Sequence, residues 1–113
     1  MKGILINPFD ETIKEVNVLG NLEDIYLLTD CRIFDIVSLS GTDDLYIDDE
    51  GLLKENRYFN IYGKTLAGKG LIMGHDSEGN STSTNLSLQE IKDVVKWLPE
   101  GHIEEPYMEF KVF

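Results

Sequence analysis

The segment from residue 66 to residue 98 constrains the fold most, because it holds a well-defined helix start, an apolar strand and a long polar loop. Ser87 and Glu90 have the spacing of a capping box, in which side chain and backbone exchange hydrogen bonds at the first helical turn. Apolar residues at positions 88, 91, 94, 95 and 98 then recur with helical period, and Pro99 ends the pattern. The sequence therefore predicts an amphipathic helix over residues 88–98.

A short buried strand is predicted just before this helix. The apolar run from residue 71 to residue 73 lies between Gly70 and Gly74, and glycines at such positions fit bends or close backbone approach. We expect this strand and the helix to cover one another. The loop from Ser77 to Asn85 is polar and rich in small residues, which is typical of a surface loop.

Alternating apolar residues and turn residues predict the remaining elements. Asn21 is a good N-cap for a helix that ends near Asp30, with an inner face of Leu22, Ile25 and Leu27 or Leu28. Strands are predicted over residues 2–6, 14–18, 32–39, 44–48, 58–62 and 107–113. The order β-β-α-β-β-(β)-β-α-β predicts an α+β fold, a mainly antiparallel sheet of five to seven short strands with two helices on one face. At 113 residues, we expect a single domain over residues 1–113.

The charge of the chain is strongly negative and unevenly spread. Ten Lys and Arg against 21 Asp and Glu give a net charge of −11, and the segment from Glu15 to Glu50 contains ten acids and one base, Arg32. Such a field repels nucleic acid and anionic membranes and attracts basic partners. We therefore expect no direct binding of nucleic acid or membranes and favour a protein partner. The alternative is that the charge serves solubility alone.

Cysteine usage and hydropathy favour the cytoplasm. The single cysteine, Cys31, excludes an internal disulfide and is typical of a reducing compartment. We expect it to be buried and unreactive, because Asp30 beside it does not favour the thiolate. No apolar run approaches the roughly 20 residues of a membrane helix, and the run near the N-terminus is too short for a secretory signal.

Five acids are the candidates for contact with a partner: Asp43, Asp44, Asp48, Asp49 and Glu50. Their oxygens suit a hard cation, but the alternating ligands and central glycine of a calcium loop are missing. Acid–base catalysis needs two carboxyl groups held across a cleft, which this spacing does not provide. We interpret the five as a solvated acidic face and expect no metal site and no cofactor.

A nucleotide pocket is the second candidate site. Lys64, Lys69 and His75, together with the Ser77–Asn85 loop, combine cations, an imidazole and hydroxyl groups. The residues from 67 to 70 offer the glycine and lysine of a phosphate-binding turn. They lack the P-loop spacing, however, and they enter a strand rather than a helix.

Five features, taken in order, resemble a known family. They are the first strand ending at Pro8, the helix after Gly20 and Asn21, the sequence LYIDDEGL over residues 45–52, the sequence AGKGLIMG over residues 67–74, and residues 76–79 leading into 86–88. Together they are similar to the family catalogued as domain of unknown function 3846, small proteins found largely in bacteriophages, prophages and mobile elements of mostly Gram-positive hosts. The resemblance extends to Leu98 and leaves residues 101–113 unmatched. It implies a genomic context and brings no catalytic residues.

The leading hypothesis is a non-enzymatic accessory factor of a phage or mobile element that engages a host protein through its acidic face, as a mimic of nucleic acid or an inhibitor of a host defence protein. A nucleotide-sequestering protein is the alternative, and a domain without assignable activity is a further one. We expect no enzymatic activity, because no nucleophile is paired with a base at a recognisable spacing. A monomer and a homodimer through the predicted edge strand Tyr107–Phe113 both stay open.

Overall fold

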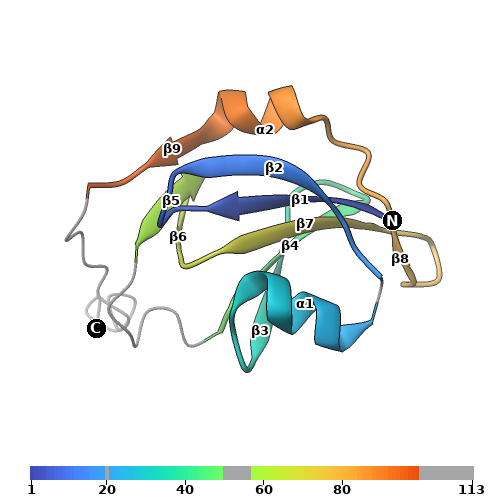
Figure 1. Ribbon diagram of the computed structural model, residues 1–113. Coiled ribbons are helices and arrows are strands. Elements are labelled where there is room, and N and C mark those ends of the chain that lie inside the picture. Colours follow the sequence, from blue (N-terminus) through green and yellow to red (C-terminus); the bar gives the residue numbers. More distant parts are fainter. Residues whose placement is uncertain (20, 50–56, 100–113) are drawn as a thin grey trace, which may run out of the picture.

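The computed structural model describes residues 1–19, 21–49 and 57–99, and all structural statements below concern these residues. Two helices and nine strands follow one another along the chain (Figure 1). Their bounds are β1 Lys2–Asn7, β2 Thr12–Asn17, α1 Leu22–Thr29, β3 Phe34–Ser38, β4 Asp43–Asp48, β5 Tyr58–Ile61, β6 Lys64–Ala67, β7 Gly70–His75, β8 Ser81–Thr82, α2 Leu88–Val94 and β9 Val95–Trp97. The predicted α+β class is confirmed.

The strands form two antiparallel sheets. The larger has the order β2-β1-β7-β4-β3, with β8 beside β7, and the smaller has the order β6-β5-β9. The predicted strand between the two glycines is β7, which lies at the centre of the larger sheet. A Cβ atom on Gly74 would lie 2.5 Å from the carbonyl oxygen of Ser83. Glycine therefore allows β8 and the chain after it to approach β7 closely.

The larger sheet is covered on both faces. On one face Ile72 and Leu45 pack with Phe59 of β5 and Ile91 of α2. On the other face Leu71, Met73 and Tyr46 pack with Ile25 of α1. The expectation that both helices lie on one face is therefore wrong: α1 and α2 cover opposite faces (Figure 1).

The helix starts are confirmed, and one helix end is not. Asn21 caps α1 by accepting the backbone N–H of Asp24, and the capping box of Ser87 and Glu90 is formed in both directions. The second helix ends at Val94 rather than at residue 98. Residues 95–97 form β9, which pairs with β5. Valine and tryptophan are good strand formers, and the ladder bonds to β5 outweigh the helical period that their sequence also satisfies.

Part of the predicted surface lies outside the described residues. This holds for Glu50 and for the predicted edge strand Tyr107–Phe113. Neither of the described helices has the length and apolar composition needed to cross a bilayer.

Candidate functional site

The predicted acidic residues lie in different environments and do not form one exposed face. Asp43 is 2% exposed and Asp48 is 8% exposed, whereas Asp49 is exposed. Asp43 begins β4 where this strand lies between β3 and β7, and Asp48 ends it where it pairs with β3. Because both side chains are buried, Asp43 and Asp48 cannot present their carboxylates to a partner. This part of the prediction is wrong.

Asp43 instead fixes the loop that follows β8. Its Oδ1 accepts hydrogen bonds from the hydroxyl of Thr84 at 2.6 Å and from the backbone N–H of Asn85 at 3.0 Å. Its Oδ2 accepts longer bonds, both 3.3 Å, from the hydroxyls of Ser40 and Thr42. A buried carboxylate needs such donors. Asp43 therefore has a structural role, joining segments 41 residues apart in the sequence.

Asp44 pairs with His75 at the end of the larger sheet. The Nδ1 of His75 lies 2.6 Å from the Oδ2 of Asp44, and the side chains are 34% and 15% exposed. Ser81 lies directly across from His75 on β8. An aspartate can orient an imidazole as a base in this way, but among the described residues no hydrogen bond joins His75 to Ser81 or to another hydroxyl. The pair ties the ends of β4 and β7 together.

The three residues of the predicted nucleotide pocket do not converge. Lys69 directly precedes β7 and His75 is its last residue, so the two are roughly 20 Å apart at about 3.3 Å per residue. Lys64 extends elsewhere and donates to the carbonyl oxygen of Ser38 at 3.5 Å. The predicted site is therefore divided between two ends of one strand and a separate sheet.

Asp76 organises the turn at the start of the Ser77–Asn85 loop. Oδ1 of Asp76 accepts the backbone N–H groups of Glu78 and Asn80, both at 2.9 Å. The pKa of Asp76 lies below its usual value of 3.8, mainly because the carboxylate accepts a hydrogen bond from the backbone of Asn80. Among the described residues, no three His, Cys, Asp or Glu side chains gather as a metal ion would require.

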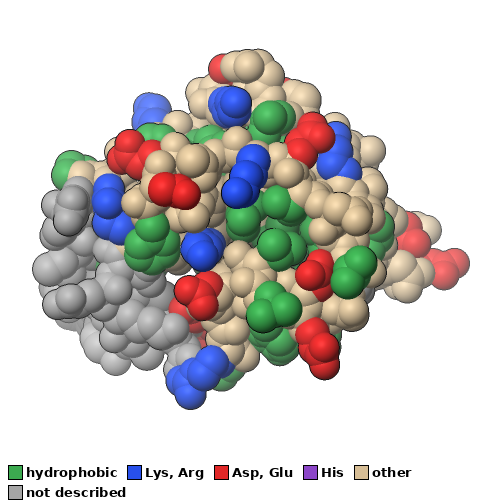
Figure 2. Space-filling model, in the orientation of Figure 1, with side chains coloured by type: hydrophobic (Ala, Val, Ile, Leu, Met, Phe, Trp, Pro, Cys, Tyr) green, Lys and Arg blue, Asp and Glu red, His purple; other side chains and the backbone are tan. Residues whose placement is uncertain are grey.

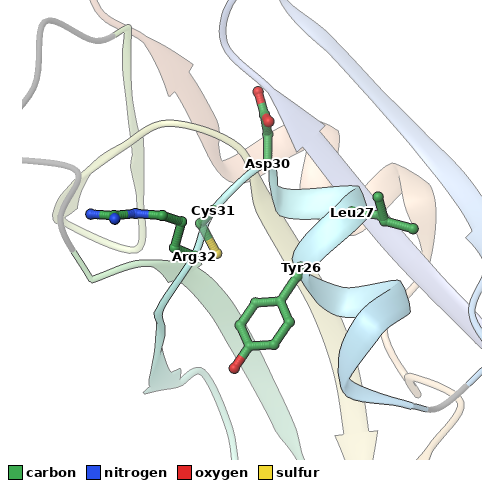
Figure 3. Close-up of a pocket in the computed structure, with 5 residues that line it drawn as sticks. All are labelled: Tyr26, Leu27, Asp30, Cys31 and Arg32. Carbon is green, nitrogen blue, oxygen red and sulfur yellow. The ribbon is translucent and has the colours of Figure 1, made fainter.

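An open pocket of about 350 Å³ lies where α1 ends (Figure 3). Its lining residues come from α1 and the segment that leaves it: Tyr26, Leu27, Asp30, Cys31 and Arg32. Cys31 is half-buried rather than buried, and its Sγ lies 3.0 Å from Oγ1 of Thr29. Because the Thr29 hydroxyl donates to the carbonyl of Ile25 at 2.7 Å, the thiol is the donor in that contact. The thiol thus has a local structural contact.

The family model described as a domain of unknown function, DUF3846, matches residues 1–98 of the chain. The chain belongs to this family. The match confirms the resemblance found in the sequence and ends where the resemblance ends. No curated protein and no solved structure matches the chain significantly. The family description names no activity, so the function of this DUF3846 protein has to be argued from its own surface.

The surface around α1 and β3 combines exposed apolar and acidic side chains. Three large apolar side chains on these two elements are 50% to 79% exposed, and two acids on α1 or next to it are also exposed. Figure 2 shows hydrophobic and acidic side chains mixed over the part of the molecule that carries α1. We name this surface the α1–β3 face and define it by Leu22, Leu27, Ile36, Glu23 and Asp30. Ile36 points to the same side of the sheet as Phe34, which is the side that α1 covers.

Packing between rings joins the two elements of the α1–β3 face. The ring of Tyr26 on α1 lies 5.2 Å from that of Phe34 on β3, which lies 5.2 Å from that of Tyr46. The exposed positions on α1 were not predicted from the sequence of this DUF3846 protein. Its apolar pattern had predicted Leu22 on the inner face of the helix. A usable signal was present for Leu27. It follows the buried Ile25 by two positions, about 200° around the helix, so the two side chains cannot share one face.

Proposed function

We propose that this protein is a non-enzymatic binding protein that engages a basic partner protein through the α1–β3 face. The observation that carries the proposal is the exposure of three large apolar side chains on that face, with Leu27 at 79%. Singly exposed apolar residues are ordinary, but a group of them next to acids is typical of an interaction site. This face replaces the acids from 43 to 50 as the candidate contact surface.

The charge of the face supports a basic partner. Glu23 lies one helical turn before Leu27, and Asp30 lines the pocket beside it. The whole chain carries a net charge of −11. Complementary charge speeds association and selects partners, while buried apolar anchors supply most of the affinity.

Residues 1–19, 21–49 and 57–99 contain no assembled catalytic set, which supports a non-enzymatic role. Within the described residues, the imidazole of His75 is bonded to Asp44 and to no hydroxyl. The partner we propose is a host protein in the cytoplasm of a bacterium, and the protein would act as an accessory factor of a phage or mobile element. The genomic context implied by the family resemblance supports that setting.

The experiment compares three forms of the full-length protein as bait. The face variant carries Leu27→Ser and Ile36→Ser, the charge variant carries Glu23→Lys and Asp30→Lys, and the control carries Asp10→Lys and Glu15→Lys, which make the same charge change at exposed positions off the face. Proteins retained from a bacterial lysate are quantified, and the binding of each retained candidate is then measured with purified components.

We expect one basic protein to bind the wild type and the control alike. The face variant should weaken its binding by at least about 30-fold, the size of a hot-spot loss of roughly 2 kcal/mol. The charge variant should mainly slow association and reduce the dependence on salt. Equal loss with the control, no loss with the face variant, or no retained basic protein would contradict the proposal.

A further inference from the structure

The strand β3 is the last strand of the larger sheet, and its hydrogen-bonding pattern shows which backbone groups face outward. Leu39 donates to the carbonyl of Asp43 at 3.0 Å, and Asp49 donates to that of Ile33 at 2.9 Å. In an antiparallel pair, residues alternate between bonding to the partner strand and facing away from it. Positions 33, 35, 37 and 39 therefore bond to β4. The N–H and C=O groups of Phe34, Ile36 and Ser38 point away from the sheet.

This outer edge is long enough for a further strand and has few of the usual protective features. Natural edge strands are protected by several charges, by proline or by bulges. All five residues of β3 pair with β4 in continuous register, and they include one charged residue, Asp35, and no proline. Among the described residues, no strand pairs with this edge.

Two local contacts cover parts of the edge. The outward N–H of Ile36 donates to Oδ1 of Asp35 at 2.8 Å, and the ammonium group of Lys64 donates to the outward carbonyl of Ser38 at 3.5 Å. Both contacts involve exposed side chains that can rotate away. The Asp35 carboxylate would then be available to a cation on an incoming chain.

We propose that β3 accepts an extended segment of the basic partner as an additional strand of the larger sheet. This inference rests on the function proposed above and specifies how the α1–β3 face is used. Main-chain bonds to Phe34, Ile36 and Ser38 hold the segment, and its alternate side chains give specificity. Apolar side chains of the segment pack beside Ile36, which is 50% exposed, and a lysine or arginine lies opposite Asp35.

Charge favours a partner over a second copy of this chain as the occupant. Two copies paired through β3 would bring together chains that each carry −11, which opposes association. A basic segment meets the opposite sign. Self-pairing is therefore an outcome that the experiment must distinguish.

The probe is a nine-residue synthetic peptide of alternating lysine and valine, tested against the same peptide with N-methyl groups on every second residue. N-methylation removes the donors of one peptide edge and keeps the charge. Binding to the isotopically labelled full chain is followed by NMR. We expect the unmethylated peptide to bind at least tenfold more tightly, and the amides of Phe34, Ile36 and Ser38 to shift and exchange more slowly with solvent.

Two variants separate backbone from side-chain contributions. Ile36→Pro removes an outward donor without removing a bond to β4, a position where an edge strand tolerates proline. Ile36→Ala removes the side chain and keeps that donor. We expect Ile36→Pro to weaken peptide binding at least tenfold with little change in melting temperature, and Ile36→Ala to weaken it about threefold.

Several results would overturn the strand addition. The first is that the methylated peptide binds as tightly as the unmethylated one, and the second is that neither peptide binds. The third is that the Ile36→Pro variant binds the unmethylated peptide as tightly as the wild type does. The fourth is that the wild type forms a concentration-dependent dimer that Ile36→Pro abolishes. The methylated peptide keeps the test decisive if Ile36→Pro fails to fold. If the methylated peptide binds equally and Leu27→Ser weakens both peptides, the strand addition fails and the proposed face stands. If the methylated peptide binds equally and neither Leu27→Ser nor Ile36→Ser changes peptide binding, both the strand addition and the proposed contact face fail.

Discussion

Replacing Asp43 with alanine should destabilise the protein strongly, although this acid was predicted from the sequence to face a partner. Its two short hydrogen bonds, 2.6 Å from Thr84 and 3.0 Å from Asn85, join the start of β4 to the loop after β8. A hydrogen bond to a charged group contributes about 1.5–3 kcal/mol, and the two bonds of 3.3 Å count for little. We therefore expect a loss of about 3–5 kcal/mol in the free energy of unfolding.

The loss would be a large part of the stability of a domain of this size, which is on the order of 5–15 kcal/mol. It corresponds to a fall in melting temperature of about 12–20 °C, at roughly 4 °C per kcal/mol. Urea unfolding measures it, with the fluorescence of the single tryptophan, Trp97, as the signal. Hydrogen exchange should also accelerate at the backbone amide of Asn85, which loses its acceptor.

Two further variants make the test of Asp43 specific. Thr84→Val removes the shorter bond to Asp43 and also the acceptor of the Leu86 amide. We expect it to lower the free energy of unfolding by about 2 kcal/mol. In a double-mutant cycle with Asp43→Ala, we expect a coupling energy of roughly 1–2 kcal/mol. Asp49→Ala, which changes an exposed acid just after the other end of β4, should change stability by less than about 0.5 kcal/mol. If Asp43→Ala costs no more than Asp49→Ala, the structural role assigned to Asp43 is refuted.

Two further predictions follow from the same region of the molecule. Gly74→Ala should cost about 1–3 kcal/mol, because its Cβ would lie 2.5 Å from the carbonyl oxygen of Ser83. Gly41→Ala, which meets nothing within 4 Å, is the matched control for thermal unfolding, and equal melting temperatures would contradict the close approach. Because the backbone of Asn80 lowers the pKa of Asp76 below 3.8, its contribution to folding is present above that pH and is lost as the pH falls through the lowered value. Carboxyl NMR titration should give a midpoint below 3.8 for Asp76, and a midpoint at or above 3.8 would contradict the assignment of its hydrogen bonds.

Local rules predicted the elements of this fold well. The capping box at Ser87 and the N-cap at Asn21 depend on residues within three positions of each other, so the sequence contains everything that they require. Alternation and apolar runs placed β1, β2, β3, β4 and β7 for the same reason, because the side-chain pattern of a strand is a local property. The short strand β8 was not predicted and lies within the segment that was expected to be a loop. The charge of the chain and its family membership were also determined by the sequence alone.

Pairing between distant segments decided the rest. Residues 95–97 satisfy a helical period, yet they form β9 because β5 lies beside them in the folded chain. Asp43 and Asp49 look alike in the sequence. Contacts with Thr84 and Asn85, 41 and 42 residues away, make Asp43 structural, whereas Asp49 stays exposed. Lys69 and His75, six positions apart in the sequence, are separated because β7 extends its residues by about 3.3 Å per position. The tertiary structure also decided which leucines of α1 stay exposed, since one helix can bury only the side chains that meet the sheet.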